Sequence, residues 1–492
     1  EVLDEEDSLT VYRNLLVPER ANATASTTLS VLHSSDNNQY CMTVYEDGRK
    51  LKFLSQPRIR RQPYYGYSRS TVVTPVFLFI NSTGYTPDLT VLGPTVGNNL
   101  AGGAQAIRPD QMPERWIDYT SADVVCMSLD TAVLAAKNRR QQWQALRRWV
   151  ASGGNLLIFG LGQKYESVPE LETVLDLPHT KGDALQAWTD PSLMYRSARV
   201  DGYDDEYEQN YAYQYAVGNQ WEDGPAPPAP LPEPDADSDD ADGTTGEFPF
   251  LWRSLGMGTV VAFRAANPFP GHGATWGWFF NTLGTKRLRW GQRHGLSLSK
   301  RNSDFMDFLI PGVGLAPVTL FQVLITLFVV GIGPLNYWLL RRNHKLHLLL
   351  VTVPGSAALV TIGLFMYAMF ADGFGTQVRA RSLAHLDQRN GEEVVWSRTS
   401  YYAGLAPSDG LTFSENTAVY PIEHRIGGNS HNNRSVVWDG QQRLNRGWLP
   451  SRVPTQAMII RADASDRKLE IVSGQGTSPT VSNHLGGRVS GL

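Results

Sequence analysis

The chain carries at residues 143–160 the sequence WQALRRWVASGGNLLIFG, which decides the class of its central fold. Apolar side chains recur at three- and four-residue spacing up to residue 150, so residues 139–150 are expected to form an amphipathic helix. Ser-Gly-Gly at 152–154 should end this helix, because glycine readily adopts the left-handed backbone of a helix cap. The apolar run at 155–159 then predicts a strand.

A second apolar run, at residues 123–127, precedes the helix and also predicts a buried strand. Strand, helix, Gly-Gly and strand make a βαβ unit, which implies a parallel sheet with helices on its faces. Residues 1–90 differ, because short alternating runs separated by turn signals predict an antiparallel β-sandwich. Its expected strands include residues 9–12, 28–32, 40–45 and 72–80.

Two long runs without a charged residue follow, at 315–340 and 346–371. Each exceeds the roughly 20 helical residues that cross a hydrocarbon core. Only five residues join them, so we expect a transmembrane helical hairpin over 313–372, with Pro334 kinking or loosening its first helix. Two buried helices of a soluble core are the alternative, and the missing polar stripe disfavours it.

The basic residues of the connecting loop, Arg341, Arg342 and Lys345, favour a cytoplasmic loop by the positive-inside rule. Basic residues in both flanks weaken this orientation. We expect a two-pass protein of the bacterial inner membrane whose N- and C-terminal domains are extracytoplasmic. Small residues in the two spans could form a packing face for another helix: Gly331, Gly333, Gly355 and Ser356.

Beyond the hairpin, residues 373–492 again alternate and predict a second β-sandwich. The segment TVSNHLG at 480–486 resembles a strand and turn after which further strands follow, so we expect the natural chain to continue past Leu492. The first residue is Glu1, which leaves open a removed N-terminal segment.

Composition narrows the classes of function. A chain of 492 residues has room for about three domains. With 42% apolar residues, 19% charged residues and a net charge of −4, it gives no general reason to expect a nucleic-acid partner. Two cysteines, Cys41 and Cys126, are too few for a disulfide scaffold or a four-cysteine zinc site.

Several motifs resemble a known architecture. The segment at 143–160 resembles the helix-to-strand part of class I glutamine-amidotransferase-like domains, and GMGTVVAF at 256–263 resembles a late strand of them. GPLNY at 333–337, with LLRR at 339–342, resembles the membrane hairpin of a family of uncharacterised bacterial proteins. The resemblance implies a β-sandwich, a non-catalytic amidotransferase-like α/β domain over 91–312, the hairpin and a C-terminal β-domain.

No catalytic constellation is predicted. The nucleophile motif Gly-x-Cys-x-Gly is missing, and Cys126 lies in an apolar run, where a buried cysteine is the better interpretation. The loop GLGQK at 160–164 lacks the third glycine of a phosphate cradle. The acidic and tyrosine-rich residues 201–215 are interpreted as a solvated loop and His272 as part of a packing loop. We therefore expect no enzyme activity, cofactor or metal.

Two further segments suggest surface roles. Residues 221–247 are rich in Pro, Asp and Ala and are expected to form a disordered insertion in the α/β domain. A basic stretch close to the first span is expected to contact lipid headgroups or a partner's acidic surface, with lipid favoured. Its residues are Lys286, Arg287, Arg289, Trp290 and Arg293.

Together these features predict a non-enzymatic, membrane-anchored scaffold or accessory subunit of a bacterial envelope or transport complex. Its partners would be the lipid bilayer and other membrane or envelope subunits. Two alternatives remain open. One is an extracytoplasmic glycan or ligand receptor that uses aromatic loops near Tyr207 or Trp276, and the other is a degenerate amidotransferase-like hydrolase.

Overall fold

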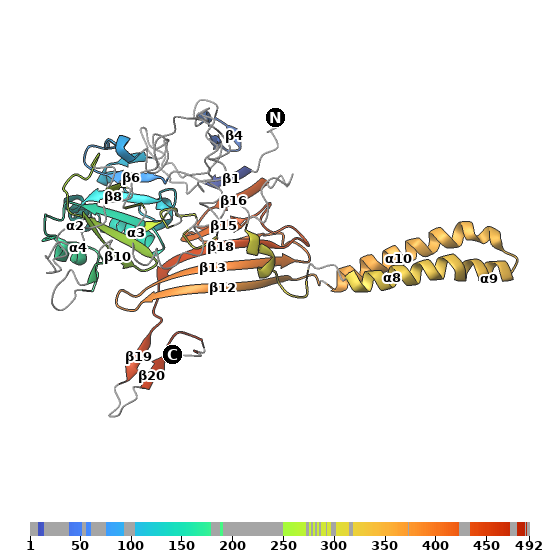
Figure 1. Ribbon diagram of the computed structural model, residues 1–492. Coiled ribbons are helices and arrows are strands. Elements are labelled where there is room, and N and C mark those ends of the chain that lie inside the picture. The colour runs from blue at the N-terminus through green and yellow to red at the C-terminus, as the bar shows by residue number, and fades with distance from the viewer. Residues whose placement is uncertain are drawn as a thin grey trace, which may run out of the picture. The chain divides into compact units, whose positions relative to one another are not determined.

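The computed structural model (Figure 1) gives the chain a mixed α/β fold with one largely parallel sheet and several other sheets, most of them antiparallel. It separates into two compact units: the first comprises Glu1–Ser26, Ser297–Leu383 and Trp396–Ile459, and the second Thr27–Leu296, Ala384–Val395 and Ile460–Leu492. The described residues are 8–13, 39–51, 56–60, 75–92, 104–178, 187–189, 249–271, 275–276, 279–280, 283–284, 287–291, 293–296, 302–313, 318–371, 373–422, 433–472, 480–487 and 489.

The second unit contains a six-stranded sheet in the order β10-β11-β9-β8-β6-β7. All neighbours pair in parallel except β10 and β11, which form an antiparallel hairpin at one edge. The strands are β6 (Phe77–Ile80), β7 (Ala104–Ile107), β8 (Val124–Ser128), β9 (Asn155–Phe159), β10 (Phe250–Leu255) and β11 (Gly258–Phe263). The predicted parallel sheet is confirmed.

Three α-helices with fully described bounds accompany this sheet: α2 (Leu129–Asn138), α3 (Arg140–Ala151) and α4 (Val168–Val174). The Ser128 side chain caps α2 by accepting a hydrogen bond from the backbone N–H of Thr131. Gly153, just past the end of α3, has a φ of +126°, which a side chain would disfavour. The predicted helix, glycine end and strand are therefore confirmed, because β8 and β9 pair in parallel across them.

The central strands β6, β8, β9 and β11 are almost completely buried, as expected for a parallel sheet covered on both faces, whereas the edge strands β7 and β10 are partly exposed. An aromatic cluster on one side joins Phe250 and Phe263 to Phe269, Trp276 and Phe279. Their rings pack edge-to-face, stacked or tilted, with centroids 5.0–5.7 Å apart for the closest pairs. Short 3₁₀ helices lie between the strands: η1 (Thr90–Leu92), η3 (Pro109–Gln111) and η4 (Trp116–Tyr119).

Two strands expected in an N-terminal sandwich belong elsewhere. β6, which begins within the predicted strand 72–80, pairs in parallel with β7 and β8 in the six-stranded sheet. β1 (Ser8–Arg13) pairs in parallel with β16 (Asn433–Trp438) near the other end of the chain. These two assignments were wrong because alternation indicates a strand but not its partner. Residues 28–32 lie outside the described residues.

Two four-stranded sheets are formed mainly by residues beyond the hairpin. The first, β1-β16-β17-β14, adds β17 (Gln441–Leu444) and β14 (Leu411–Ser414). The second, β12-β13-β18-β15, consists of β12 (Thr376–Asp387), β13 (Glu392–Ala403), β18 (Thr455–Ala464) and β15 (Thr417–Ile422). Both sheets contribute to one hydrophobic cluster, with Val436 and Leu444 from the first and Val419 and Ile459 from the second.

Three small antiparallel pairs complete the described strands. They are β2 (Gln39–Met42) with β5 (Gln56–Arg60), β3 (Tyr45–Glu46) with β4 (Arg49–Lys50), and β19 (Leu469–Val472) with β20 (Thr480–Asn483). Cys41 lies in β2. The predicted disordered insertion at 221–247 lies outside the described residues.

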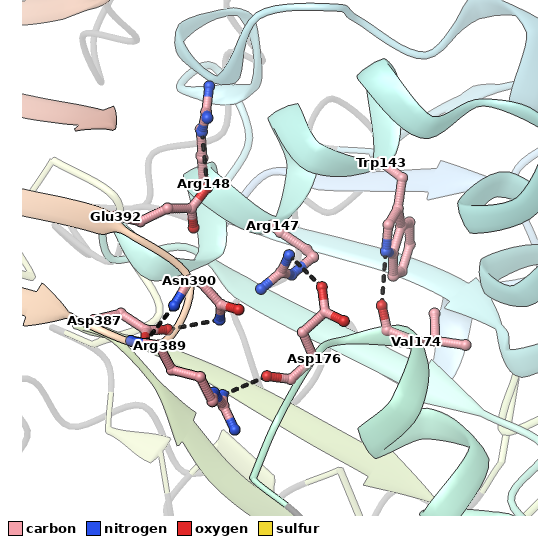
Figure 2. Close-up of polar contacts among 9 residues, drawn as sticks. All are labelled: Trp143, Arg147, Arg148, Val174, Asp176, Asp387, Arg389, Asn390 and Glu392. Atoms are coloured by element: carbon pink, nitrogen blue, oxygen red, sulfur yellow. Dashed lines mark hydrogen bonds and ion pairs between the residues drawn. The ribbon is translucent and has the colours of Figure 1, made fainter. Parts of the chain in front are cut away.

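The turn between β12 and β13 contacts α3 within the second unit (Figure 2). Glu392 accepts a hydrogen bond from Arg148 Nε at 3.0 Å, and Arg389 donates to the carbonyl of Asp176. Arg147 forms an ion pair with the Asp176 carboxylate at 2.7 Å. Asp387 Oδ1 stabilises the turn, because it accepts hydrogen bonds from the backbone N–H groups of Arg389 and Asn390. This network explains why Ala384–Val395 belongs to the second unit.

The apolar segments form helices in the first unit. α8 (Val318–Val330) passes through a π-helix, η7 (Gly331–Leu335), into α9 (Asn336–Arg342), and α10 (Leu349–Ala371) follows a short turn that ends in η8 (Leu346–Leu348). Figure 1 shows α8–α9 and α10 side by side. The π-helix contains Pro334, which has no N–H to donate, so the loosening predicted at this proline is confirmed.

Candidate functional site

The helical hairpin, residues 318–371, exposes many apolar side chains in the part whose side chains are described, residues 322–366. No described side chain between residues 322 and 366 is buried. Leu350 is 84% exposed and Leu359 72%, and large apolar side chains of the first helical segment are exposed as well, including Leu327 and Val329. An exposed apolar surface of this extent marks a site of interaction with a membrane or another protein.

One helix among the described residues is long and apolar enough to cross a membrane, at Leu346–Met366. The first segment is interrupted by the π-helix, so that neither α8 nor α9 reaches such a length alone. Backbone dihedrals at Val330, Leu335 and Asn336 are nonetheless helical, so the chain does not leave the helix between α8 and α9. The two-pass arrangement remains a prediction.

Aromatic and basic side chains gather at the closed end of the hairpin. The Arg341 guanidinium lies 6.0 Å from the centroid of the Tyr337 ring, and that of Arg342 lies 5.5 Å from the Trp338 ring. These i, i+4 contacts follow from the tilt of helical side chains toward the N-terminus. Lys345 in the turn is also exposed. Tyrosine, tryptophan and arginine in this order are typical of a membrane–water interface.

A single polar contact joins the two helices among the described residues. Asn336 Nδ2 donates to Thr352 Oγ1 at 3.0 Å. The predicted packing-face residues Gly331, Gly333 and Gly355 do not touch the opposite helix, since a Cβ added to any of them would meet nothing within 4 Å. Ser356 Oγ donates to the carbonyl of Thr352 in its own helix. The small-residue face thus plays no part in closing the hairpin, and its role toward another helix stays a prediction.

Arg379 connects the two ends of the hairpin in the first unit. This residue follows α10 in β12, and its Nη1 donates to the carbonyl of Leu309, which precedes α8, at 2.6 Å. Its guanidinium and that of Arg398 lie 4.6 and 4.9 Å from the centroid of the Phe308 ring in η6 (Ser303–Phe308). Arg398 also pairs with Asp304. Basic side chains at this end are therefore engaged by the protein itself.

The basic stretch before the hairpin also faces the protein interior. Trp290 is 5% exposed and stacks on Trp149, with ring centroids 5.9 Å apart. Its backbone N–H donates to Asp123 Oδ1 at 2.7 Å, while the N–H of Val76 donates to Oδ2 at 2.8 Å. Trp290 therefore cannot reach lipid headgroups in this conformation, and its assignment as a membrane-surface residue was wrong.

Arg293 is bound in the same way. Its guanidinium donates to Asn155 Oδ1 at 2.6 Å, to Thr259 Oγ1 at 3.0 Å and to the carbonyl of Met257 at 3.0 Å. Burial, with a smaller effect of Arg287, lowers the pKa of the Arg293 guanidinium to about 9. Arg293 thus fastens the amino ends of β9 and β11, and its predicted role in membrane contact was also wrong.

For the other residues of the basic stretch, contact with lipid or a partner stays a prediction. Arg287 is half-buried with its guanidinium 5.9 Å from the Trp252 ring, and Arg289 lies near Asp123. Lys286 lies outside the described residues. Burial raises the pKa of the Asp123 carboxyl to about 6, against two backbone N–H donors and Arg289, which lower it. Burial lowers the pKa of the neighbouring His294 to about 4.

Ligand sites of parallel α/β sheets lie at the carboxyl ends of the strands. Here Cys126 in β8 is 1% exposed within an apolar cluster, and burial raises the pKa of its thiol. Ser128 has an extended backbone (φ −75°), not the strained turn of a nucleophile, and its hydroxyl caps α2. Neither residue is an activated nucleophile, because neither is both exposed and deprotonated.

The glycine loop after β9 is not a phosphate cradle in this conformation. Gly160 and Gly162 have φ values of +90° and +89°. The N–H of Gly160 donates to the carbonyl of Ala265, and that of Leu161 to the carbonyl of Phe263. A phosphate would have to displace both bonds, which tie this loop to the end of β11.

The aromatic receptor loop is likewise closed. Trp276 is fully buried, and its indole N–H donates to the carbonyl of Pro270 at 3.0 Å, so it offers no face for a sugar. Tyr207, His272 and the acidic residues 201–215 lie outside the described residues. Within the described part of the chain, no three His, Cys, Asp or Glu side chains are grouped to hold a metal.

Sequence reasoning missed the network of Asp123, Asn155 and Arg293. Asn155 donates to the carbonyls of Asp123 and Arg287 while accepting from Arg293, so every polar group of its amide is used. The sequence carried only one polar residue at the start of each apolar run, Asp123 and Asn155. Such a residue is equally typical of a solvated loop. The network holds the ends of the strands together.

Comparisons with known proteins give no relative of this chain. A scan against models of protein families finds no match, and searches among curated proteins and solved structures find none either.

Proposed function

We propose that the chain is a non-enzymatic, membrane-anchored scaffold or accessory subunit of a bacterial envelope or transport complex. The observation that carries this proposal is the hairpin 318–371, whose described side chains are nowhere buried between residues 322 and 366. Exposure of this apolar surface to water is energetically unfavourable, whereas the hydrocarbon core of a bilayer would cover it. α10 alone, with 23 residues, spans about 34 Å at 1.5 Å per residue, which matches a hydrocarbon core of about 30 Å.

The proposed topology is two-pass, with the turn at 341–345 in the cytoplasm and both flanking regions extracytoplasmic. Its support is charge. Arg341, Arg342 and Lys345 are exposed, whereas Arg293, Arg379 and Arg398 on the other side of the spans are engaged with carbonyl, carboxylate or aromatic groups. The positive-inside rule depends on exposed basic residues close to the spans, so this difference favours a cytoplasmic turn.

The finer architecture is part of the proposal. The largely parallel six-stranded sheet supports the resemblance to class I glutamine-amidotransferase-like domains, and the hydrophobic cluster shared by two four-stranded sheets supports a C-terminal β-sandwich. The proposal assigns no catalysis to the sheet, because Cys126 is buried as a thiol and Ser128 caps a helix. Fold resemblance alone carries no activity.

The membrane anchor is tested by washing membranes that contain the full chain with sodium carbonate at high pH. We expect the full chain to stay with the membrane, and a variant whose residues 318–371 are replaced by a flexible linker to be released. Trypsin added to intact spheroplasts should then degrade the regions on both sides of the hairpin. A full chain that is released by carbonate, or that trypsin reaches only after lysis, contradicts the anchor or its orientation, respectively.

The accessory-subunit role is tested by purifying the full chain in two mild detergents of different headgroup. We expect the same stoichiometric partner in both, and loss of that partner when 318–371 is replaced by an unrelated two-helix hairpin or when the extracytoplasmic regions are removed. A clean monomer in both detergents would count against a scaffold.

A further inference from the structure

The turn of the hairpin presents a surface whose charge is not compensated by the chain. Arg341, Arg342 and Lys345 are all exposed, and the sequence contains no Asp or Glu from residue 308 to residue 371. Among the described residues, no ion pair involves any of the three. A carboxylate that could neutralise them along the hairpin is therefore absent from its sequence.

The aromatic neighbours fix the depth of these charges. The contacts of Arg341 with Tyr337 and of Arg342 with Trp338 hold both guanidinium groups beside rings that favour the interface between hydrocarbon and water. Lys345 lies beyond them in the turn, where the N–H of Lys345 donates to the carbonyl of Leu340 and closes the helix end. In a bilayer, this arrangement would place the three charges at the level of the lipid phosphate groups.

Basic side chains near the opposite end of the hairpin are used differently. Arg379 donates to Leu309 and packs on Phe308, and Arg398 packs on the same ring and pairs with Asp304. The guanidinium groups of Arg379 and Arg398 are thus bound by carbonyl, carboxylate and aromatic groups of the protein itself. The difference between Arg379 and Arg398 and the exposed basic residues of the turn points to the leaflet at the turn as the place for an anionic partner.

We propose that the turn of the hairpin binds the headgroups of acidic phospholipids, through Arg341, Arg342 and Lys345 framed by Tyr337 and Trp338. The inference rests on the proposed membrane anchor and adds to it the class of lipid and the leaflet. Long-range attraction between exposed basic groups and an anionic surface weakens as salt shortens the screening length. Binding should therefore be lipid-specific and salt-sensitive.

The test uses the full chain, incorporated into nanodiscs of phosphatidylcholine with one fifth phosphatidylglycerol. After mild extraction, the lipids that stay with the protein are counted by mass spectrometry. We expect the ratio of phosphatidylglycerol to phosphatidylcholine among these lipids to exceed the bulk ratio about fivefold, the factor that corresponds to about 1 kcal/mol for one basic side chain near an anionic surface. The enrichment should fall when sodium chloride is raised from tens to hundreds of millimolar.

The variant R341Q/R342Q/K345Q should incorporate equally well and lose the enrichment. The matched control is K137Q/R139Q/R140Q, which removes three charges from exposed residues at the α2–α3 junction, in the second unit. This control should keep the enrichment. Equal lipid ratios in the wild type and the turn variant, or equal loss in the control, would overturn the proposal. A chain that enters no nanodisc of any composition would instead overturn the membrane anchor, and the lipid preference with it.

Discussion

The six-stranded sheet and the helical hairpin are built from the same apolar residue types and place them in opposite environments. In β8, β9 and β11 the central Val, Leu and Ile side chains are at most about 1% exposed, and polar residues close the strand ends. In α10 the same kinds of side chain are largely exposed, and the helix has no polar stripe. The apolar side chains of the sheet are buried by other parts of the protein, whereas those of the hairpin can be buried only by a membrane or another molecule. Apolar content alone does not distinguish these two solutions.

The largest expected effect comes from placing one carboxylate in each region. Leu157→Asp, in the fully buried β9, should destabilise the second unit by about 4 kcal/mol or more, because the charge has no partner there. Leu359→Asp, in α10, should leave the unfolding of that unit unchanged and oppose membrane insertion by about 3 kcal/mol. Near-ultraviolet circular dichroism on heating and carbonate extraction measure the two outcomes. Equal loss of stability in both variants would erase the distinction between the regions.

The second prediction distinguishes a structural arginine from a headgroup contact. Arg293→Met should lower the free energy of unfolding by about 2–3 kcal/mol, because Asn155 Oδ1 and the Met257 carbonyl each lose their donor. Membrane association should not change. Arg139→Met, at an exposed position, is the matched control and should stay within about 0.5 kcal/mol of the wild type. Denaturant unfolding checks both. A membrane-binding defect without a loss of stability would instead indicate that Arg293 contacts lipid headgroups.

The third prediction concerns pH and the two buried groups beside the sheet. With a pKa raised to about 6, Asp123 binds a proton in the folded state first, so its contribution to stability is lost as pH rises from 4 to 6. With a pKa lowered to about 4, His294 acts in the opposite sense, and its contribution is lost as pH falls from 6.5 to 4. The two effects should roughly cancel in the wild type.

Removing either group should therefore uncover the other. Asp123→Asn should lose stability on acidification from pH 6.5 to 4, and His294→Gln should gain stability over the same range. Nearby Arg289 and Arg293 keep their charge throughout this range and affect only the midpoints. Urea unfolding at half-unit pH steps measures the slopes. Identical slopes in the wild type and both variants would show that neither group titrates within this window.

The smallest effect is expected inside the hairpin. Asn336→Leu removes the hydrogen bond to Thr352 between the helices and should weaken their association by about 0.6 kcal/mol, the average for such bonds in membranes. Thr361→Val is the matched control, because Thr361 Oγ1 bonds only to the carbonyl of Ala357 in its own helix among the described residues. Thermal unfolding of the hairpin in detergent should separate the two variants. A loss in the control as large as that in Asn336→Leu would assign the effect to the helix and not to the pair.

Local patterns predicted local structure well. The helix ending at Gly153, the strand Asn155–Phe159 and the parallel pairing of β8 with β9 follow from spacing that the chain carries within about 40 residues. Cys126 was correctly predicted to be buried, because its neighbours are apolar on both sides. The loosening at Pro334 follows from a missing N–H, which is a property of one residue.

Long-range partners could not be predicted in this way. Nothing near Trp290 in the sequence distinguishes an interfacial tryptophan from one stacked on Trp149, and Arg293 reads as a surface charge until Asn155 lies beside it. The alternative of an aromatic receptor loop near Trp276 is likewise not supported, because Trp276 is fully buried. For Trp290 and Arg293 the decisive contact joins residues that are far apart in the chain.

By itself, the sequence determined the helix that ends before Gly153, the strands at 124–128 and 155–159, which runs carry no charge and where the basic turn of the hairpin lies, because these depend on residue spacing and type. Only the tertiary structure decided that β1 pairs with β16, that β6 enters the parallel sheet and that Trp290 and Arg293 of the basic stretch are bound by the protein itself. The physical reason is that strand pairing and the burial of a charge depend on partners brought together by folding, and a linear pattern does not name those partners.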